Sequence, residues 1–278
     1  MPSFEKLKIP TTGERITFNQ GKPIVPNNPI VPFIRGDGTG VDIWPATQKV
    51  LDSAIALSYG GERNINWFKI YAGDEACENY GTYNYLPKDT IEAIKFFGVA
   101  IKGPLTTPIG GGIRSLNVAL RQIFDLYSCI RPCRYYSGTP SPHKKPQDLD
   151  IIVYRENTED IYMGIEWEAE DQICKDLINH LNNFVIPNSE KLKGRELPKS
   201  AGIGIKPVSK EGSQRHIRKA IEHAKRLQGN KKHVTLVHKG NIMKFTEGAF
   251  RDWGYDLAKQ EFRDDCITER ESWILDNI

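Results

Sequence analysis

Arginines are concentrated in one short stretch of the chain, where they could bind an anion. Between Arg114 and Arg134 the sequence has four arginines and a single acid, Asp125. Three consecutive glycines at 110–112 precede them, and backbone can approach a ligand closely at glycine. An arginine side chain binds a carboxylate or phosphate through two parallel hydrogen bonds. This composition fits a site for an anion with several acidic groups, but it also fits a solvated basic helix face. The four residues are Arg114, Arg121, Arg131 and Arg134.

The residues around these arginines predict the element that holds them. A short apolar run at 97–101 is typical of a buried strand, and a turn rich in Pro and Thr connects it to the glycines. Ser115 then stands where a helix N-cap is expected. Asn117 and Arg121 are four residues apart, so their side chains share one helix face and can reach the same ligand. A second, apolar face is formed by Leu116, Leu120, Ile123, Phe124 and Tyr127.

The composition limits the class of protein. The 278 residues are enough for two domains or one large one, and 39% of them are hydrophobic, as in ordinary globular proteins. A net charge of +3 without a Lys/Arg tract gives no indication of nucleic-acid binding. No apolar run approaches the length of a membrane span, and the N-terminus lacks the pattern of a signal peptide. We therefore expect a cytoplasmic protein that binds neither nucleic acid nor membrane.

Cysteine and histidine do not indicate a metal site. The five cysteines are odd in number and scattered, which argues against a disulfide framework. Cys129 and Cys133 have no His or further Cys at a spacing typical of zinc sites. We expect buried or half-buried free thiols. His216 and His223 lie one heptad apart on a basic helix, and we expect both to be exposed.

Strands and helices alternate in the first half of the chain. An apolar strand at 30–34 leads into a GDGTG loop, which resembles a nucleotide-binding loop but lacks the GxGxxG spacing. A helix at 41–58, a strand at 67–71 and a helix at 90–97 follow. This alternation predicts an α/β domain with a largely parallel sheet. The residues expected to face inward from the first helix are Ile43, Val50, Leu51, Ala54 and Ile55.

The second half of the chain begins with a more polar and less regular sequence. A strand at 151–154 ends in the polar run Arg155-Glu-Asn-Thr-Glu-Asp160. Residues 161–202 are polar and irregular, with one amphipathic helix through Ile173, Leu177 and Leu181, and we interpret them as an excursion that could serve as an arm for a partner subunit.

A second α/β unit begins near Gly202. Apolar spacing predicts helices at 213–228 and 246–262, with a strand at 233–238 between them. The last residues, 263–278, are charged and show no element able to complete the first sheet.

Four motifs in fixed order carry a resemblance to a known family. They are Ile101-Lys-Gly-Pro-Leu-Thr-Thr-Pro, Gly111-Gly-Ile-Arg-Ser-Leu-Asn-Val-Ala-Leu-Arg121, Tyr154-Arg-Glu-Asn-Thr-Glu-Asp-Ile-Tyr162 and His238-Lys-Gly-Asn-Ile-Met-Lys. Together they closely resemble the bacterial-type NADP-dependent isocitrate dehydrogenases of the β-decarboxylating dehydrogenase superfamily. The resemblance covers nearly the whole chain. It implies the α/β fold of isocitrate and isopropylmalate dehydrogenases, with an incomplete large sheet domain and a smaller α/β domain that carries a clasp-like excursion.

The resemblance also assigns boundaries and a reaction. It implies a large domain from 1–126, a small domain from 127–160 and 203–278, and a clasp that serves dimerisation from 161–202. The implied reaction is the oxidative decarboxylation of isocitrate to 2-oxoglutarate in the tricarboxylic acid cycle, with NADP and Mg²⁺ or Mn²⁺ as cofactors. A homodimer is the expected assembly.

The family's isocitrate-binding positions match residues of this chain one by one. Arginines can neutralise the three carboxylates of isocitrate, while a hydroxyl and an amide add neutral hydrogen bonds. Related isopropylmalate dehydrogenases carry apolar residues where this chain has Ser115 and Asn117, because their substrate has an alkyl group there. The matching residues are Ser115, Asn117, Arg121, Arg131 and Arg155.

The resemblance implies two catalytic residues. Tyr162 matches the proton donor to the enolate that forms after CO₂ leaves, and Lys239 matches the lysine that assists deprotonation of the substrate hydroxyl from the other subunit. Outside this motif context, Tyr162 would be interpreted as a core aromatic and Lys239 as a surface lysine. Positions near the nicotinamide end of the cofactor match Lys102, Thr106, Thr107 and Asn241, which could equally serve turns and strand ends.

Members of the family are longer than this chain. Their metal-binding aspartates and adenosine-phosphate loops match no residue here, so the resemblance implies a C-terminally truncated enzyme without metal ligands of its own. We expect little activity from the isolated chain, and we expect the first sheet to expose an unpaired edge or an apolar face. The alternative is a non-catalytic homologue that binds a tricarboxylate or pairs with a full-length subunit.

Overall fold

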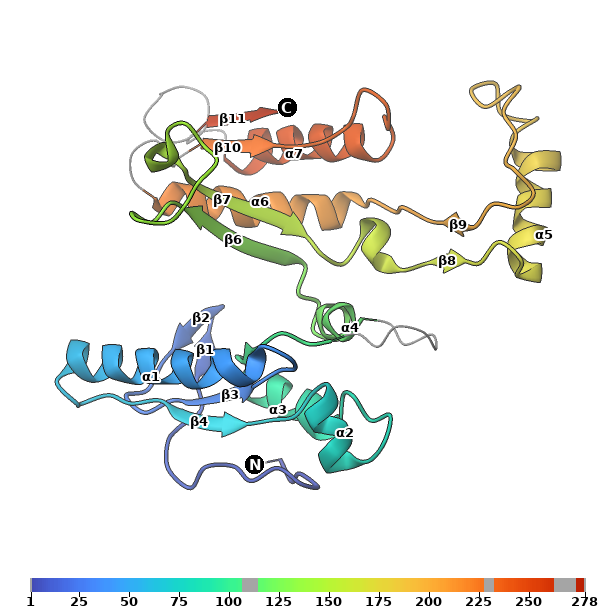
Figure 1. Cartoon of the computed structure of the whole chain (residues 1–278). Helices are drawn as coiled ribbons and strands as arrows, with labels where there is room; N and C mark the ends of the chain where they lie inside the picture. Colours follow the sequence, from blue (N-terminus) through green and yellow to red (C-terminus); the bar gives the residue numbers. More distant parts are fainter. Residues whose placement is uncertain (1, 107–114, 228–232, 263–273, 278) are drawn as a thin grey trace. The chain divides into compact units, whose positions relative to one another are not determined.

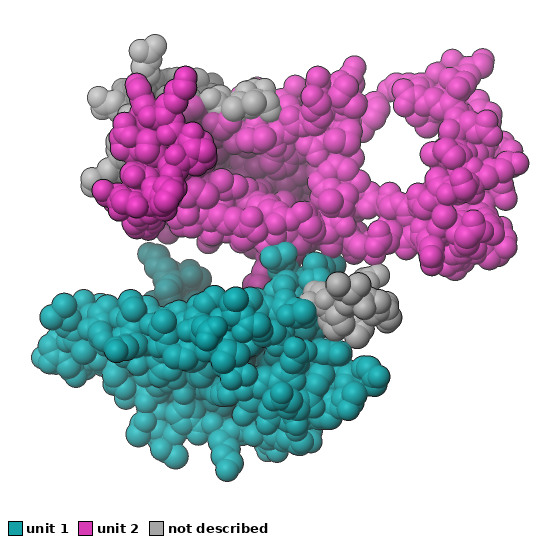
Figure 2. Space-filling model, viewed as in Figure 1, with its two compact units in different colours: residues 1–124 teal, residues 125–278 magenta. Residues whose placement is uncertain are grey.

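A computed structural model describes residues 2–106, 115–227, 233–262 and 274–277 (Figure 1). The chain divides into two compact units, residues 1–124 and 125–278 (Figure 2). Each unit is a mixture of helices and strands, and the predicted α/β class is confirmed. No helix among the described residues is long and apolar enough to cross a membrane.

The first unit is built on a three-stranded parallel sheet with the order β4-β3-β5. Its core is apolar and includes Ile34, Phe68 and Phe97, each at most 2% exposed. The elements are the hairpin strands β1 (Thr17–Asn19) and β2 (Lys22–Ile24), then β3 (Ile30–Ile34), α1 (Gly40–Tyr59), β4 (Asn66–Lys69), α2 (Asp74–Tyr80), α3 (Lys88–Phe97), β5 (Ile101–Lys102) and α4 (Leu116–Ile123).

Helix α1 buries a different face from the one predicted. Ile43 and Val50 are exposed, whereas Trp44 is buried and stacks on Phe33 with ring centroids 4.0 Å apart. The large indole decides which side of α1 faces the sheet, and this rotates the aliphatic stripe outward. Of the residues expected to face inward, Leu51 and Ile55 are half-buried. The outward stripe is an exposed apolar face on helix α1.

Two element boundaries around the glycine-rich stretch also differ from prediction. The run at 97–101 is not a single strand, because Phe97 is the last residue of α3 and Gly98 ends that helix in the left-handed region with φ 73°. Helix α4 ends at Ile123, and Asp125 has φ 46°. The predicted apolar face therefore loses its last members: Leu116 and Leu120 are buried, while Ile123 is exposed and Tyr127 lies beyond the helix.

The second unit contains the antiparallel pair β6 (Ser128–Arg134) and β7 (Asp150–Glu156) and the helices α6 (Lys210–Arg226) and α7 (Glu247–Glu261). Ile217, Ile221 and Leu257 form the centre of its core. Its other elements are the short helix η1 (Pro146–Asp148), η2 (Asp160–Met163), β8 (Glu166–Trp167), α5 (Gln172–His180), η3 (Leu181–Val185), β9 (Ile203–Gly204), β10 (His233–Leu236) and β11 (Ile274–Asn277).

Helix α6 starts earlier than predicted and buries a histidine. Ser209 is its N-cap and accepts a hydrogen bond from the Gly212 amide at 2.9 Å, so the helix begins at Lys210. His216 is only 5% exposed, which corrects the expectation of an exposed side chain. Its position one turn from buried Ala220 places it on the core face of the helix, although the surrounding sequence is basic.

The excursion and the C-terminal segment both contain strands that the sequence did not predict. Strands β8 and β9 pair in an antiparallel manner, and α5 buries Cys174 and Ile178 in place of exposed Ile173. Strand β11 pairs with β10 in parallel in the second unit, so the last residues do contain a strand, although it does not belong to the first sheet. These strands are only two to four residues long, and each forms because it pairs with a strand that is distant in sequence.

The described cysteines are free thiols, as expected. Cys174 is buried, and Cys77, Cys129 and Cys133 are half-buried. Cys266 lies outside the described residues.

Candidate functional site

Helix α4 of the first unit carries three of the predicted substrate-binding residues. Ser115 occupies the N-cap position, although its side chain does not cap the helix. Asn117 and Arg121 follow on the helix, and both are half-buried. Among the described residues, Arg121 forms no ion pair with a carboxylate. Arg114 and the glycines at 110–112 lie outside the part of the chain that the structure describes.

Lys102 of β5 shares the electrostatic environment of Arg121. Its ammonium donates a hydrogen bond to the Gly103 carbonyl at 2.7 Å. The pKa of Lys102 is lowered by burial of the ammonium and, secondly, by the positive charge of Arg121. Two cations near each other, with Asp37 as the acid that partly offsets them, favour an anionic ligand at this end of the first unit.

Asp37 organises the predicted GDGTG loop, and sequence reasoning missed its role. It is 6% exposed and accepts hydrogen bonds from the backbone amides of Asp74 and Thr106, both at 2.9 Å. The loop also lies against the segment that follows β5, since a Cβ on Gly36 would come within 2.2 Å of the Pro104 carbonyl. This loop therefore holds the start of the Thr106 segment in place. Thr107 lies outside the described residues.

Strands β6 and β7 of the second unit bring Arg131 and Arg155 to one face. In the antiparallel register Cys129 is opposite Arg155, and Arg131 is opposite Val153. Opposed residues share a face, so both arginines project from the same side of the ribbon as diagonal neighbours, roughly 7–8 Å apart at Cα. Neither forms an ion pair with a described carboxylate. The two arginines therefore project from the same face of the β6–β7 ribbon.

Tyr162 lies next to Arg155. The guanidinium of Arg155 sits over the Tyr162 ring, 4.3 Å from its centroid. Tyr162 belongs to the single turn of η2, which follows β7 after a tight loop in which Glu156 accepts hydrogen bonds from the amides of Thr158 and Glu159. The cation over the ring fixes the orientation of the Tyr162 ring relative to Arg155.

Lys239 and Asn241 belong to the loop between β10 and α7. Both are exposed, and the Lys239 amide donates to the Glu247 carboxylate at 3.0 Å. The loop packs tightly on the start of α7, because a Cβ on Gly240 would lie 2.7 Å from the Gly248 Cα. The loop backbone is thus held by α7, and the Lys239 side chain remains accessible.

A polar network below this loop was not predicted. Lys206 pairs with both Asp160 and Glu247, while Glu159 accepts hydrogen bonds from the amide and hydroxyl of Ser209. The acidic run 156–160 was visible in the sequence. Its partners lie 46 or more residues further along the chain and could be found only from the fold.

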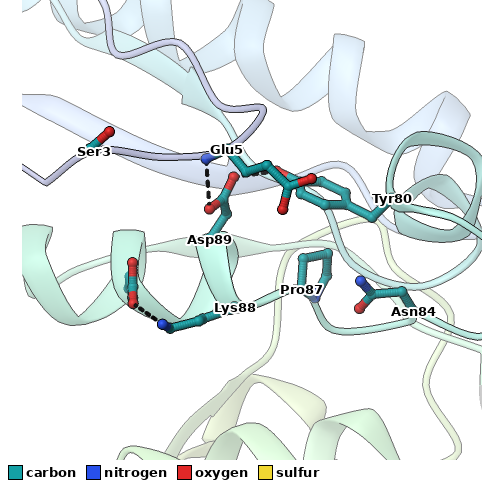
Figure 3. A pocket seen from close by; sticks show the side chains of 8 residues that line it. Ser3, Glu5, Tyr80, Asn84, Pro87, Lys88 and Asp89 are labelled. Atoms are coloured by element: carbon teal, nitrogen blue, oxygen red, sulfur yellow. Dashed lines mark hydrogen bonds and ion pairs between the residues drawn. The ribbon is translucent and has the colours of Figure 1, made fainter.

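Two cavities formed by the described residues lie away from the predicted site residues. One, of about 660 Å³, lies over α6 between β7 and β10 and includes His216 and Phe250 in its lining. The other, of about 300 Å³, is in the first unit next to Asp89 (Figure 3). Asp89 accepts hydrogen bonds from the amides of Glu5 and Lys6 and from the Tyr80 hydroxyl, so this region anchors the N-terminal arm.

The described residues do not fit the divalent cation that the resemblance implies. No group of three or more His, Cys, Asp or Glu side chains among them could hold a metal ion. Asp264 and Asp265 lie outside the described residues. We therefore derive no reaction step through a metal.

Comparison with known proteins defines the class. A model of the isocitrate/isopropylmalate dehydrogenase family matches residues 30–277, and the chain belongs to this family. Two curated relatives, the isocitrate dehydrogenases (NADP) of Nostoc sp. and Synechocystis sp., are each 68% identical over 274 residues, which is 99% of this chain and 58% of the relative. The chain thus spans about three fifths of their length.

Solved structures give the same result for the fold. The crystal structure of isocitrate dehydrogenase from Methylococcus capsulatus matches with a TM-score of 0.67 and 32% identity, covering 90% of this chain and 60% of that one. The TT0538 protein from Thermus thermophilus matches with a TM-score of 0.65 and 28% identity, covering 98% of this chain and 44% of that one.

Proposed function

We propose that the protein to which this chain corresponds catalyses the oxidative decarboxylation of isocitrate to 2-oxoglutarate and CO₂, with reduction of NADP. The family membership and the names of its 68% identical relatives support this reaction. The observation that carries the proposal is the shared face of Arg131 and Arg155 with Tyr162 against it. Binding of a tricarboxylate requires several cations without carboxylate partners. The reaction also requires a nearby group that can deliver a proton to the enolate.

In this reaction Arg121, Arg131 and Arg155 bind the carboxylates, and Ser115 and Asn117 add neutral hydrogen bonds. Lys102, Thr106, Thr107 and Asn241 would hold the nicotinamide end of NADP, which would supply the acceptor for the hydride of the hydroxyl-bearing carbon. Lys239 takes part in removing the hydroxyl proton. After CO₂ leaves, Tyr162 donates a proton to the enolate carbon, so one proton is lost and one is gained by the substrate.

We also propose a homodimer in which residues 161–202 form an intersubunit clasp. The clasp would interrupt a small domain at 127–160 and 203–278, with residues 1–126 in a large domain. Exposed apolar side chains on this excursion, Ile173 and Phe184, support a role in subunit contact. In this assembly Lys239 acts in the site of the other subunit, and Mg²⁺ or Mn²⁺ is the metal cofactor.

Turnover assays test the proposed reaction. The gene is sequenced beyond codon 278, and the longest product is assayed with isocitrate, NADP and Mn²⁺ next to the 278-residue chain. We expect the longer product to form NADPH and the short chain to form little. Turnover by the short chain would show that no further residues are needed. A stop codon after Ile278, with isocitrate binding but no turnover, would favour the non-catalytic homologue.

A further inference from the structure

Lys206 lies between two segments that carry the proposed reacting groups. Its ammonium pairs with Asp160 and, at 2.8 Å, with an oxygen of Glu247. The three side chains are only 24%, 32% and 19% exposed, respectively. A half-buried ion triad of this kind is screened less by solvent than an exposed pair.

Each carboxylate of this triad holds a different segment. Asp160 is two residues before Tyr162, has φ 60° and donates its amide to the Pro207 carbonyl at 2.9 Å. Glu247 accepts the Lys239 amide through one oxygen and Lys206 through the other. The ammonium of Lys206 is therefore the common partner of the η2 turn and the β10–α7 loop.

Two carboxylates around one cation carry a net negative charge, so removal of the cation leaves two acids facing each other. Burial lowers the pKa of Lys206, but the hydrogen bonds to Asp160 and Glu247 outweigh it, and the pKa is raised. For Glu247, burial raises the pKa, but the hydrogen bonds from Lys206 and the Lys239 amide lower it overall. The Lys206 ammonium and the Glu247 carboxylate are consequently both charged at neutral pH.

We propose that Lys206 is a positioning residue that joins the Tyr162 turn to the Lys239 loop. It contacts neither the substrate nor the reacting atoms, and its effect on the reaction rests on the function proposed above. Because Lys239 acts there in the site of the other subunit, this Lys206 bridge (Asp160, Lys206 and Glu247) ties together parts of two active sites of the dimer.

Hydrogen exchange measured by mass spectrometry tests the Lys206 bridge in the 278-residue chain, independently of any activity. In Lys206→Met the aliphatic stem is kept and the charge is lost. We expect peptides covering 158–164 and 237–246 to exchange at least tenfold faster, while α6 core peptides are unchanged. Lys206→Arg should retain most of the protection. The control Lys175→Met removes a surface pair with Glu170 and should change neither peptide.

A second variant separates bridging from a general loss of stability. Asp160→Asn leaves Lys206 paired with Glu247, so we expect faster exchange in 158–164 and unchanged exchange in 237–246. Equal loosening of both segments in this variant, or unchanged exchange in Lys206→Met, would overturn the proposal.

Kinetics of the longer, active product test the consequence for the reaction. We expect Lys206→Met to lower kcat by at least tenfold with KM for isocitrate within twofold of wild type, and Lys206→Arg to restore much of kcat. A raised KM with unchanged kcat would contradict a positioning role. If the wild-type product does not turn over isocitrate, the proposed function fails, while the exchange experiment still decides on the bridge.

Discussion

Two groups of arginines in this chain are used in different ways. On α6 and α7, Arg215, Arg218 and Arg251 each pair with a carboxylate: Arg215 binds Asp125 with both terminal nitrogens, and Arg218 binds Glu261 through two contacts of 2.6 Å. On α4, β6 and β7, the three arginines that resemble substrate-binding residues have no described carboxylate partner. These are Arg121, Arg131 and Arg155.

This difference separates charge that supports the fold from charge available to a ligand. The paired arginines are about a third exposed, and such ion pairs add little to stability. An unpaired guanidinium contributes less still to folding, but it can form charge-assisted hydrogen bonds with a carboxylate that arrives from solution. The comparison therefore predicts two different outcomes. Substitutions of the unpaired arginines should weaken ligand binding and leave stability unchanged, whereas substitutions of the paired arginines should lower stability and leave ligand binding unchanged.

The largest expected effect is on substrate binding by Arg121. In the longer, active product, Arg121→Ala removes up to two charge-assisted hydrogen bonds, about 3 kcal/mol together, which corresponds to roughly 100-fold weaker isocitrate binding. NADP affinity and Tm should stay near wild type. Titration calorimetry measures both affinities, with Arg218→Ala as the matched control. Unchanged isocitrate affinity would show that Arg121 does not bind the substrate.

A smaller effect is expected from Arg155→Lys. Lysine keeps the positive charge but loses the planar fork and the flat contact with the Tyr162 ring. We expect about a tenfold loss in kcat/KM for isocitrate, that is, about 1.4 kcal/mol. Steady-state kinetics check this, and the same change at Arg251 serves as the control. Wild-type kinetics for Arg155→Lys would show that the fork is not used.

The paired group should affect stability only. Arg215→Ala removes the contacts with Asp125 and the stacking over Tyr127, whose centroid is 4.5 Å from the guanidinium. We expect the free energy of unfolding to fall by about 1 kcal/mol. Urea denaturation of the 278-residue chain measures this change. If Arg215→Ala in the longer product weakens isocitrate binding by more than twofold, the paired arginines also affect ligand binding, and the proposed difference between the two groups is wrong.

The smallest effect concerns the buried histidine of α6, His216. Burial lowers the pKa of His216, so the unfolded chain binds more protons than the folded chain below about pH 6.5. Stability from this group is complete above that pH and decreases as the pH falls, by at most about 1.4 kcal/mol per unit. Urea denaturation between pH 7 and 5.5 should show a shallower decrease for His216→Gln. An exposed control, His143→Gln, should keep the wild-type slope.

Local pattern predicted much of the fold. The helical spacing of 213–228 and 246–262 located α6 and α7, and the glycines and Ser115 located the start of α4. These elements repeat one apolar period over several turns, which is information contained in neighbouring residues. The face that α1 buries could not be predicted in this way, because Trp44 is chosen over Ile43 by the shape of Phe33 and Trp67 on the sheet.

The sequence by itself determined the family, the α/β class and the identity of the candidate site residues, since ordered motifs and helical spacing are properties of neighbouring positions. Only the tertiary structure decided that Arg131 and Arg155 share a face, that His216 is buried and that Lys206 bridges Asp160 and Glu247. Strand register and ion pairing join residues up to 46 positions apart in these cases. Such contacts depend on how the chain packs against itself, which no local pattern encodes.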